Sequence, residues 1–325
     1  MKRIVAGLAT LAGGIAALGA INTWLSWRAG PLESQLPGGT SRFYHWLRDG
    51  QVYNVFYKVA GEGMPVVLVH GIDGAGSSFE MRQPFGALQD NYRVYALDLL
   101  GFGLSDRPAL PYTAADYVDL LEDFLREVVE QPAAIIAGSL SAAFAVQVAA
   151  RAADRVRALV LICPTGLERL ADPPPSWQRS LGSILRTPII GSTLFNLLVS
   201  RASLGYFLRG RTYADASRVT EKLIDAYYCT SHQAGARYAP AAFIAGDLNQ
   251  SIRDTYPTLT QPIAVVWGRD AQVTPSSDAN LFIHANPRTQ LDVLGNAGLL
   301  PQEERSTDFL AVVRRTLSQA PSTPA

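Results

Sequence analysis

Short apolar runs alternate with segments of helical periodicity along most of the chain. The apolar runs are closed by turn residues, which is typical of strands that are buried on both faces of a sheet. They lie at residues 66–70, 92–98, 133–137, 158–163, 263–267 and 290–294. A further strand is predicted at residues 51–59, where aromatic and β-branched side chains are concentrated.

Helical patterns fill the intervals between these runs. The clearest pattern has Thr113 as its N-cap and Asp116 at the capping-box position, followed by apolar residues on one face. Other helices are predicted after residue 139 and from Asp308 onward. Alternation of strands and helices implies right-handed crossovers, so we predict an α/β fold with a mostly parallel central sheet that binds ligands at the carboxyl ends of its strands.

One interval, residues 166–259, breaks this alternation. It contains no convincing strand pattern, and its helical patterns are interrupted by prolines. We interpret it as a helical cap inserted between two parts of the core, residues 42–165 and 260–318.

The N-terminus differs in kind from the rest of the chain. Lys2 and Arg3 precede a charge-free run, residues 4–27, whose first part is almost wholly apolar or small and is about long enough to span a bilayer. We predict that residues 1–28 form an uncleaved transmembrane anchor. A cleaved signal peptide is the alternative, because residues 17–19 form a small-x-small site.

The distribution of positive charge places the N-terminus of this anchor in the cytoplasm and the globular part on the extracytoplasmic side. Residues 29–41 are rich in proline and glycine and are predicted to be a linker. Residues 319–325 are predicted to form a disordered tail.

Composition narrows the range of partners. Lys+Arg and Asp+Glu each number 28 and are interspersed, so no basic stripe is present and nucleic acid is not expected as a partner. Cys163 and Cys229 lack metal-binding spacing, and we expect either two buried thiols or one bridge between them. No metal, nucleotide or flavin motif occurs, so we predict no cofactor. Nothing in the composition indicates a protein partner.

The segment 134–143, AIIAGSLSAA, carries the candidate chemistry. An apolar run ends in small residues around Ser139 and opens into a helical pattern, as in a nucleophile elbow, where Ser139 occupies a sharp strand-to-helix turn. Ser141 also fits the pattern of small residues, but Ser139 keeps the expected spacing to the following helix. A carboxylate nucleophile is excluded, because no Asp or Glu occurs between Gln131 and Arg151.

The chain resembles the α/β-hydrolase family, in the branch of capped enzymes that includes haloalkane dehalogenases, epoxide hydrolases and carbon-carbon bond hydrolases. LVHGIDG at 68–74 is similar to the family's loop after the third strand, DLLGFGLSDRP at 98–108 to its DxxGxGxS segment, and VVWGRD at 265–270 to a later strand and turn. The resemblance covers about residues 52–317. It implies that the backbone N–H groups of Ile72 and Leu140 form an oxyanion hole.

The resemblance also implies roles for residues near Ser139. His70 is expected to support the oxyanion loop rather than to transfer protons. Residues expected to line the pocket are His70, Asp73, Ser141, Cys163 and His232.

A serine nucleophile needs a base, and the base needs an acid to orient it. At the positions where the family has its acid and its histidine, this chain has Ala271 and Leu299. Asp270 could act as an acid displaced by one residue. Only His70 and His232 of the four histidines could approach Ser139, and His232 would have to descend from the cap.

We carry two functions forward from these observations. By resemblance, the chain is a membrane-tethered hydrolase of an ester or similar lipophilic small molecule, acting through Ser139 with weak or unconventional activity. The alternative is a non-catalytic protein that binds an apolar ligand or a protein partner beneath its cap.

Overall fold

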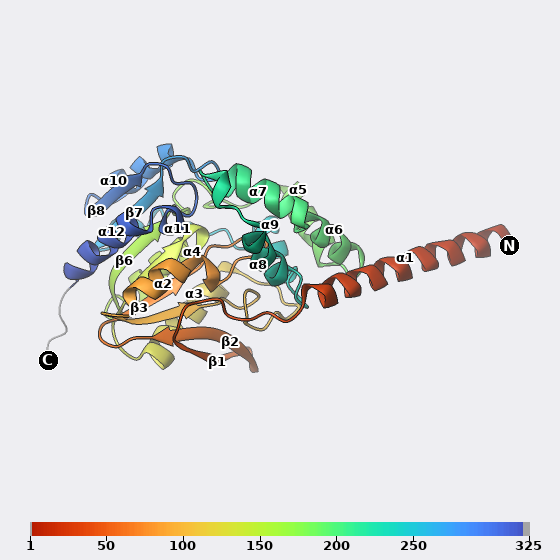
Figure 1. Cartoon of the computed structure of the whole chain (residues 1–325), viewed down its shortest axis with the longest axis horizontal. Helices are drawn as coiled ribbons and strands as arrows, with labels where there is room; N and C mark the ends of the chain where they lie inside the picture. Colours follow the sequence, from red (N-terminus) through yellow and green to blue (C-terminus); the bar gives the residue numbers. More distant parts are fainter. Residues whose placement is uncertain (1, 321–325) are drawn as a thin grey trace.

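The computed structural model describes the backbone of residues 2–320 and the side chains of residues 13–320. Its centre is an eight-stranded sheet in the order β1-β2-β4-β3-β5-β6-β7-β8 (Figure 1). β2 pairs antiparallel with β1 and β4, and all other neighbouring strands are parallel. The strands are Thr40–Arg48 (β1), Gln51–Ala60 (β2), Pro65–Val69 (β3), Arg93–Leu97 (β4), Ala133–Gly138 (β5), Val156–Ile162 (β6), Ile263–Gly268 (β7) and Thr289–Leu294 (β8). The predicted α/β fold with a mostly parallel sheet is confirmed.

The central strands are recognisable in the sequence as apolar runs because their residues are buried. Every residue of β3, β5 and β7 is buried, as expected for strands covered on both faces. β1 was not predicted, because it is an edge strand in which only Tyr44 and Trp46 are buried.

Helices pack around the sheet in pairs. α2 (Arg82–Leu88) contacts α12 (Ser306–Ser318), and α3 (Ala114–Phe124) contacts α4 (Ser139–Arg151). The predicted capping box is present at the start of α3. α10 (Ala279–Ala285) packs on β7 and β8. These helices place the start of α4 at the carboxyl end of β5.

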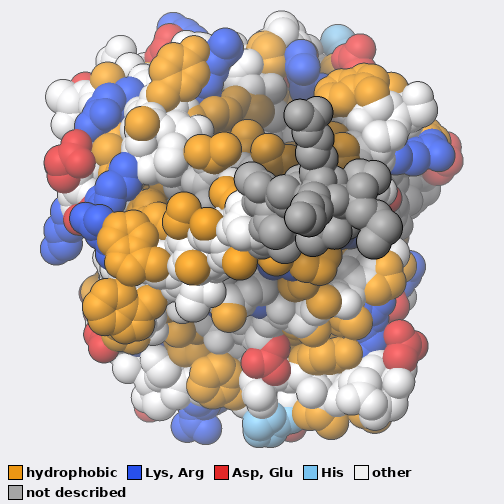
Figure 2. Space-filling model, turned by 90° about the vertical axis from the view of Figure 1, so that its right-hand side faces the viewer, with side chains coloured by type: hydrophobic (Ala, Val, Ile, Leu, Met, Phe, Trp, Pro, Cys, Tyr) orange, Lys and Arg blue, Asp and Glu red, His pale blue; other side chains and the backbone are white. Residues whose placement is uncertain are grey.

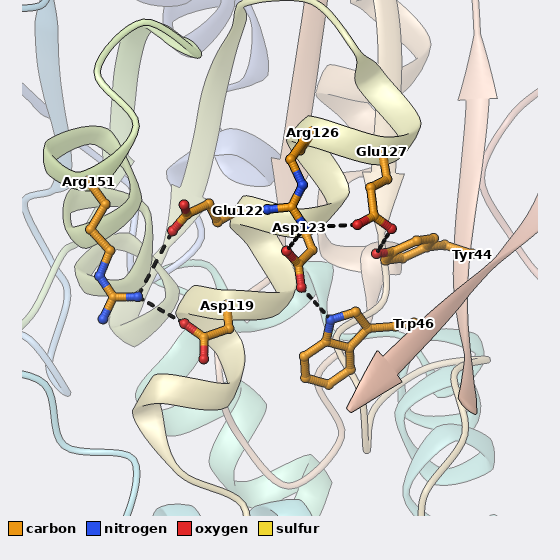
Figure 3. Close-up of polar contacts among 8 residues, drawn as sticks. All are labelled: Tyr44, Trp46, Asp119, Glu122, Asp123, Arg126, Glu127 and Arg151. Atoms are coloured by element: carbon orange, nitrogen blue, oxygen red, sulfur yellow. Dashed lines mark hydrogen bonds and ion pairs between the residues drawn. The ribbon is translucent and has the colours of Figure 1, made fainter. Parts of the chain in front are cut away.

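Polar contacts attach α3, and the π-helical turn Leu125–Val129 that continues it, to the neighbouring elements on both sides (Figure 3). Tyr44 and Trp46 of β1 donate hydrogen bonds to Glu127 and Asp123, at 2.7 and 2.9 Å. On the other side, Arg151 at the end of α4 forms ion pairs with carboxylates of α3. The contacts therefore link the edge strand to the helix that begins at Ser139.

The interval predicted to form the cap is helical. Between β6 and β7 the chain forms α5 (Ser176–Arg186), α6 (Ile190–Leu198), α7 (Arg201–Phe207), α8 (Glu221–Ser231) and α9 (Tyr238–Ala245). Figure 1 shows these helices grouped beside the sheet, on the side from which the N-terminal helix projects. They enclose a second hydrophobic cluster that includes Leu185, Phe195, Leu223 and Tyr227. The cap thus has a core of its own.

The N-terminal segment forms one helix, α1 (Lys2–Ala29), that points away from the rest of the molecule (Figure 1). The predicted anchor falls partly on residues 1–12, whose side chains lie outside the described set, as do residues 321–325 of the predicted tail. Among the residues that are described, no single helix has both the length and the hydropathy needed to cross a bilayer; only α5 and α6 taken together, with a bend of 109°, reach that threshold.

Asp98 organises the loops beside the candidate site. It follows β4, and its carboxylate accepts hydrogen bonds from the N–H groups of Ser78 (2.6 Å) and Leu104 (2.8 Å). The Ser105 hydroxyl donates to the Asp98 carbonyl and accepts from the N–H of Phe56. Gly103 has φ +49°, and a Cβ there would overlap the Asp98 carboxyl group. The DxxGxGxS segment is therefore a structural junction.

Substitution of Asp98 tests this junction. Asp98→Asn should lower the free energy of unfolding by about 1–3 kcal/mol, because the amide nitrogen cannot accept one of the two buried N–H groups. Urea unfolding followed by circular dichroism measures the change. Asp90→Asn, at an exposed position, is the control and should match the wild type. Equal stability of Asp98→Asn and the wild type would contradict the assignment.

Candidate active site

Ser139 occupies a strained turn. β5 ends at Gly138, α4 begins at Ser139, and Ser139 has φ +52°, a left-handed conformation that costs free energy for any residue with a Cβ. This is the turn that the sequence predicted for a nucleophile. Ser141, the alternative serine, lies in the first turn of α4 and is fully buried. The geometry of an elbow therefore belongs to Ser139.

Ser139 lies in the wall of a cavity of about 250 Å³. Most of the other side chains in the wall are apolar, and the apolar ones come from both the core and the cap. They are Ile72, Ile162, Leu170, Phe207, Phe243, Val273, Leu299 and Leu300. The polar groups in the wall are Asp73, Glu80, Thr165, Arg169, Thr212, Thr274 and Gln302. Such a cavity suits a small, largely apolar molecule with a few polar atoms.

The two predicted oxyanion donors flank this serine. Ile72 lies in the cavity wall, in the loop after β3. Leu140 is the second residue of α4, so its N–H is one of the first amides of the helix, which have no carbonyl partner four residues earlier in the helix. The positive end of the α4 dipole favours negative charge at the same place.

His70 supports the loop. It is fully buried, its Nδ1 donates to the Gly71 carbonyl at 2.6 Å, and its Nε2 accepts from the N–H of Leu99 at 3.1 Å. Burial lowers the pKa of His70. Both ring nitrogens are occupied by backbone groups, so His70 has no free nitrogen to offer to Ser139.

His232 lies away from Ser139. Its ring stacks on Tyr228 with centroids 3.8 Å apart, and its Nδ1 lies 2.9 Å from the Tyr228 carbonyl oxygen. It borders a groove formed with α1 and α6 rather than the cavity at Ser139. The packing of α8, which the sequence pattern does not reveal, turns His232 toward the N-terminal helix.

The structure also separates other predicted pocket residues from the cavity. The wall includes Asp73 but not His70, Ser141, Cys163 or His232. Cys163 is buried beyond the end of β6, where burial raises the pKa of its thiol to about 12. Cys163 and Cys229 are both free thiols.

Leu299 and Ala271, at the positions aligned with the family's histidine and acid, have different surroundings. Leu299 lies in the cavity wall, held by a 2.7 Å hydrogen bond from its N–H to the Thr212 carbonyl in the cap. Ala271 is buried in the core, and Asp270 is exposed to solvent and does not line the cavity. The turn after β7 therefore does not bring Asp270 to Ser139.

Glu80 is the cavity residue that sequence reasoning missed. It belongs to the short 3-10 turn Ser78–Met81 and is 4% exposed. Its Oε2 accepts a hydrogen bond from the N–H of Gly71 at 3.0 Å. Burial raises the pKa of Glu80 well above its usual range, and the nearby Asp73 carboxylate raises it further. No spacing rule marks a single glutamate in such a turn.

Two further buried glutamates have structural partners. Arg82 and the Tyr213 hydroxyl both bond to the Glu303 carboxylate. Glu304 accepts the N–H groups of Gly298 (2.6 Å) and Ala214 (2.9 Å), which ties the loop that carries Leu299 to the cap. Within the described residues, no group of three or more His, Cys, Asp or Glu side chains is arranged to hold a metal ion.

Comparisons with known proteins agree with this arrangement. Residues 66–312 match the model of the alpha/beta hydrolase family. The 2-hydroxymuconate semialdehyde hydrolase of Pseudomonas putida is 28% identical over 269 residues, which are 80% of this chain and 89% of the relative. The 2-hydroxy-6-oxo-6-(2'-aminophenyl)hexa-2,4-dienoic acid hydrolase of Metapseudomonas resinovorans is 27% identical over 270 residues, 81% of this chain and 87% of the relative.

Solved structures are similar over nearly their whole length. A mutant of the meta-cleavage product hydrolase from Pseudomonas fluorescens IP01 (CumD) superposes with a TM-score of 0.65 at 26% identity, covering 82% of this chain and 94% of that chain. A serine hydrolase involved in carbazole degradation (CarC) superposes with a TM-score of 0.70 at 22% identity, covering 86% and 99%. At 22% identity, the similarity to CarC shows a shared fold.

Proposed function

The chain belongs to the alpha/beta hydrolase family, and from this membership we propose that it hydrolyses a small lipophilic ester through Ser139. The observation that carries the proposal is the strained Ser139 turn in the wall of a mostly apolar cavity. In the first step Ser139 Oγ attacks the acyl carbon, and the carbonyl electron pair moves to oxygen. The N–H groups of Ile72 and Leu140 receive the negative charge.

The proposed substrate class follows from the walls of the cavity. A volume of about 250 Å³ lies at the small end of ligand pockets, so a short acyl or aryl group fits best. The relatives named above are hydrolases of small organic acids and aldehydes, which supports a small substrate. With Leu299 in place of histidine, turnover through a conventional triad is not expected; loss of such a histidine costs about 10⁶-fold in turnover.

We further propose that α1 tethers the protein to a membrane. Asn22 fixes α1 to the cap: its Nδ2 donates to Ile189 O (3.1 Å) and Thr193 Oγ1 (3.0 Å), and its Oδ1 accepts from Asn196 Nδ2 (2.9 Å). Figure 2 shows hydrophobic side chains gathered on this face of the molecule. The large exposed ones on the described parts of α1 and α6 are Ile15, Ile21, Trp24, Trp27, Ile190, Leu194, Leu197 and Leu198. A lipid surface would cover them and would bring lipophilic substrates to the cap.

Reaction with a fluorophosphonate probe tests the nucleophile. The wild type should be labelled at one site per chain, and Ser139→Ala should abolish labelling, because the probe bonds to an activated serine oxygen. Ser141→Ala is the matched control and should be labelled like the wild type. Absence of wild-type labelling, together with no turnover of short acyl esters, would contradict hydrolysis through Ser139.

Restoring a conventional triad tests the alignment. Ala271→Asp with Leu299→His should raise esterase activity at least about tenfold, because a positioned imidazole contributes general-base catalysis of about 10²–10⁴-fold. Initial rates on p-nitrophenyl acetate provide the measurement. Ala271→Asn with Leu299→Gln is the control of similar size without a base. A folded double variant that is no faster than this control would refute the alignment.

Membrane extraction tests the tether. The full chain, expressed in bacteria, should stay in the membrane pellet after a sodium carbonate wash at high pH, because a spanning helix resists conditions that release peripheral proteins. The intact mass of the pelleted chain should be that of the full 35.1 kDa protein. A shortened chain in the supernatant would instead indicate a cleaved signal peptide.

A further inference from the structure

Two carboxyl groups, Asp73 and Glu80, share the cavity of Ser139, and we propose that they form a proton relay that activates this serine in place of a histidine. Glu80 takes the serine proton, and Asp73 holds the negative charge that drives the transfer. The inference rests on the proposed function, hydrolysis through Ser139. It assigns the base that this function lacks at Leu299.

The loop after β3 places Glu80 next to Ser139. A Cβ added to Gly71 would lie 3.5 Å from Glu80 Oε2 and 3.5 Å from Ser139 Cβ. These two atoms therefore lie within twice that distance of each other, and residue 71, a glycine, contributes no side chain to the space between them. Rotation of the serine hydroxyl or one bridging water spans such a gap. The Gly71 N–H bond keeps Glu80 Oε2 on this side.

Asp73 completes the relay behind Glu80. A hydrogen bond from the Glu80 side chain to Asp73 lowers the pKa of Asp73, although burial has the larger effect and raises it. Glu80 is buried and Asp73 is half-buried, and simultaneous ionisation of two such adjacent carboxyls is disfavoured, because like charges repel at short range. The pair therefore holds one proton, and we place it on Glu80, which accepts a single backbone N–H, from Gly71, whereas the Gly76 N–H bonds to Asp73. Asp73 also accepts the Ala75 N–H at 2.7 Å, which favours its ionised form.

Charged groups on the surrounding elements favour the same assignment. Arg82 on α2 acts on the charge of Glu80, but its guanidinium is bound by Glu303 on α11 (Pro301–Glu304). His70, after β3, adds no positive charge beside Asp73, because its Nε2 accepts the Leu99 N–H and the ring is therefore neutral. In the cap, burial raises the pKa of the Tyr227 hydroxyl on α8, and the nearby carboxyl groups of Glu80, Asp73 and Glu303 raise this pKa further. Among the described side chains, Glu80 thus has no cation of its own, in contrast to Glu303.

Unpartnered polar atoms in the same cavity wall indicate that a polar ligand group or water binds here. Gln302 is 1% exposed, and its Oε1 has no hydrogen-bond partner among the described residues. Its Nε2 donates to the Glu80 carbonyl at 3.4 Å, which places it beside the pair. The hydroxyl of Thr165 is likewise buried and without a partner in the described part of the chain. Leaving such groups without a hydrogen bond is unfavourable, so a ligand atom or water that bonds to them stabilises the site.

The relay balances protons and charge in both half-reactions. As Ser139 Oγ bonds to the acyl carbon, its proton passes to Glu80 Oε2, and the proton on the other Glu80 oxygen passes to Asp73. The carbonyl electron pair becomes the oxyanion. When the intermediate collapses, the C–O bond of the ester breaks, and the leaving alcohol takes a proton back through Glu80. Water then attacks the acyl group, the relay accepts its proton, and Ser139 Oγ leaves with that proton.

The rate of fluorophosphonate labelling as a function of pH tests the relay. Asp73 must be ionised, and burial raises its pKa, so the wild-type rate should fall on acidification at a higher pH than an ordinary aspartate would give. Glu80→Gln and Asp73→Asn should each slow labelling at neutral pH at least about 100-fold. Asp73→Asn should also abolish the acidic limb of the profile. Glu122→Gln, on the distant α3, is the control and should keep the wild-type rate and profile.

A variant that keeps both carboxyls tests the relay even if Glu80→Gln and Asp73→Asn do not fold. Gly71→Ala places a methyl group at ordinary contact distance from both Glu80 Oε2 and Ser139 Cβ, so it should separate them, slow labelling at least about tenfold and leave the thermal midpoint unchanged. Wild-type rates and pH profiles in Glu80→Gln and Asp73→Asn would overturn the relay while leaving Ser139 as the nucleophile. If those variants do not fold, a wild-type rate in Gly71→Ala overturns it. No labelling of the wild type would overturn the proposed function itself.

Discussion

The turn at Ser139 is the constraint on which the rest of the site depends. β5 is buried between β3 and β6, and α4 starts with no intervening loop, so the backbone must reverse within one residue of positive φ. That conformation costs free energy, and the fully buried residues on either side of the turn hold it in place. The turn fixes the serine hydroxyl, the Leu140 amide and the start of the helix dipole together. The loop after β3 lies close to this turn, with Gly71 between Glu80 and Ser139.

The buried carboxyl groups near this turn fall into two kinds. Glu303 and Glu304 are satisfied by Arg82, Tyr213 and backbone N–H groups, and they bind the cap to the core. Glu80 and Asp73 have backbone donors but no cation of their own. Burial without a cation keeps a proton on the pair near neutral pH. Glu80, which holds a proton in the wall of the Ser139 cavity, can exchange that proton with a substrate. Glu303, whose carboxylate is already bound by Arg82 and Tyr213, cannot.

The sequence predicts those parts of the molecule whose signals are local. Central strands such as β3 and β5 appear as apolar runs, and the capping box of α3 appears at Thr113 and Asp116. The turn at Ser139 follows from small residues between a strand and a helix. In contrast, β1 is half exposed and lacks an apolar run, and the directions of His232 and Cys163 depend on how the cap and the end of β6 pack. Glu80 has no periodicity or spacing that marks it; the only signal is a carboxylate in a turn flanked by buried residues.

The central claim is that Ser139 forms a covalent acyl intermediate. Rapid quenching during turnover of p-nitrophenyl acetate, followed by mass spectrometry of peptides, measures it most directly. We expect a mass increase of one acetyl group on the peptide that contains Ser139, formed together with a burst of one p-nitrophenol per chain. Turnover without an acylated Ser139 peptide, or acylation at another residue, would contradict it.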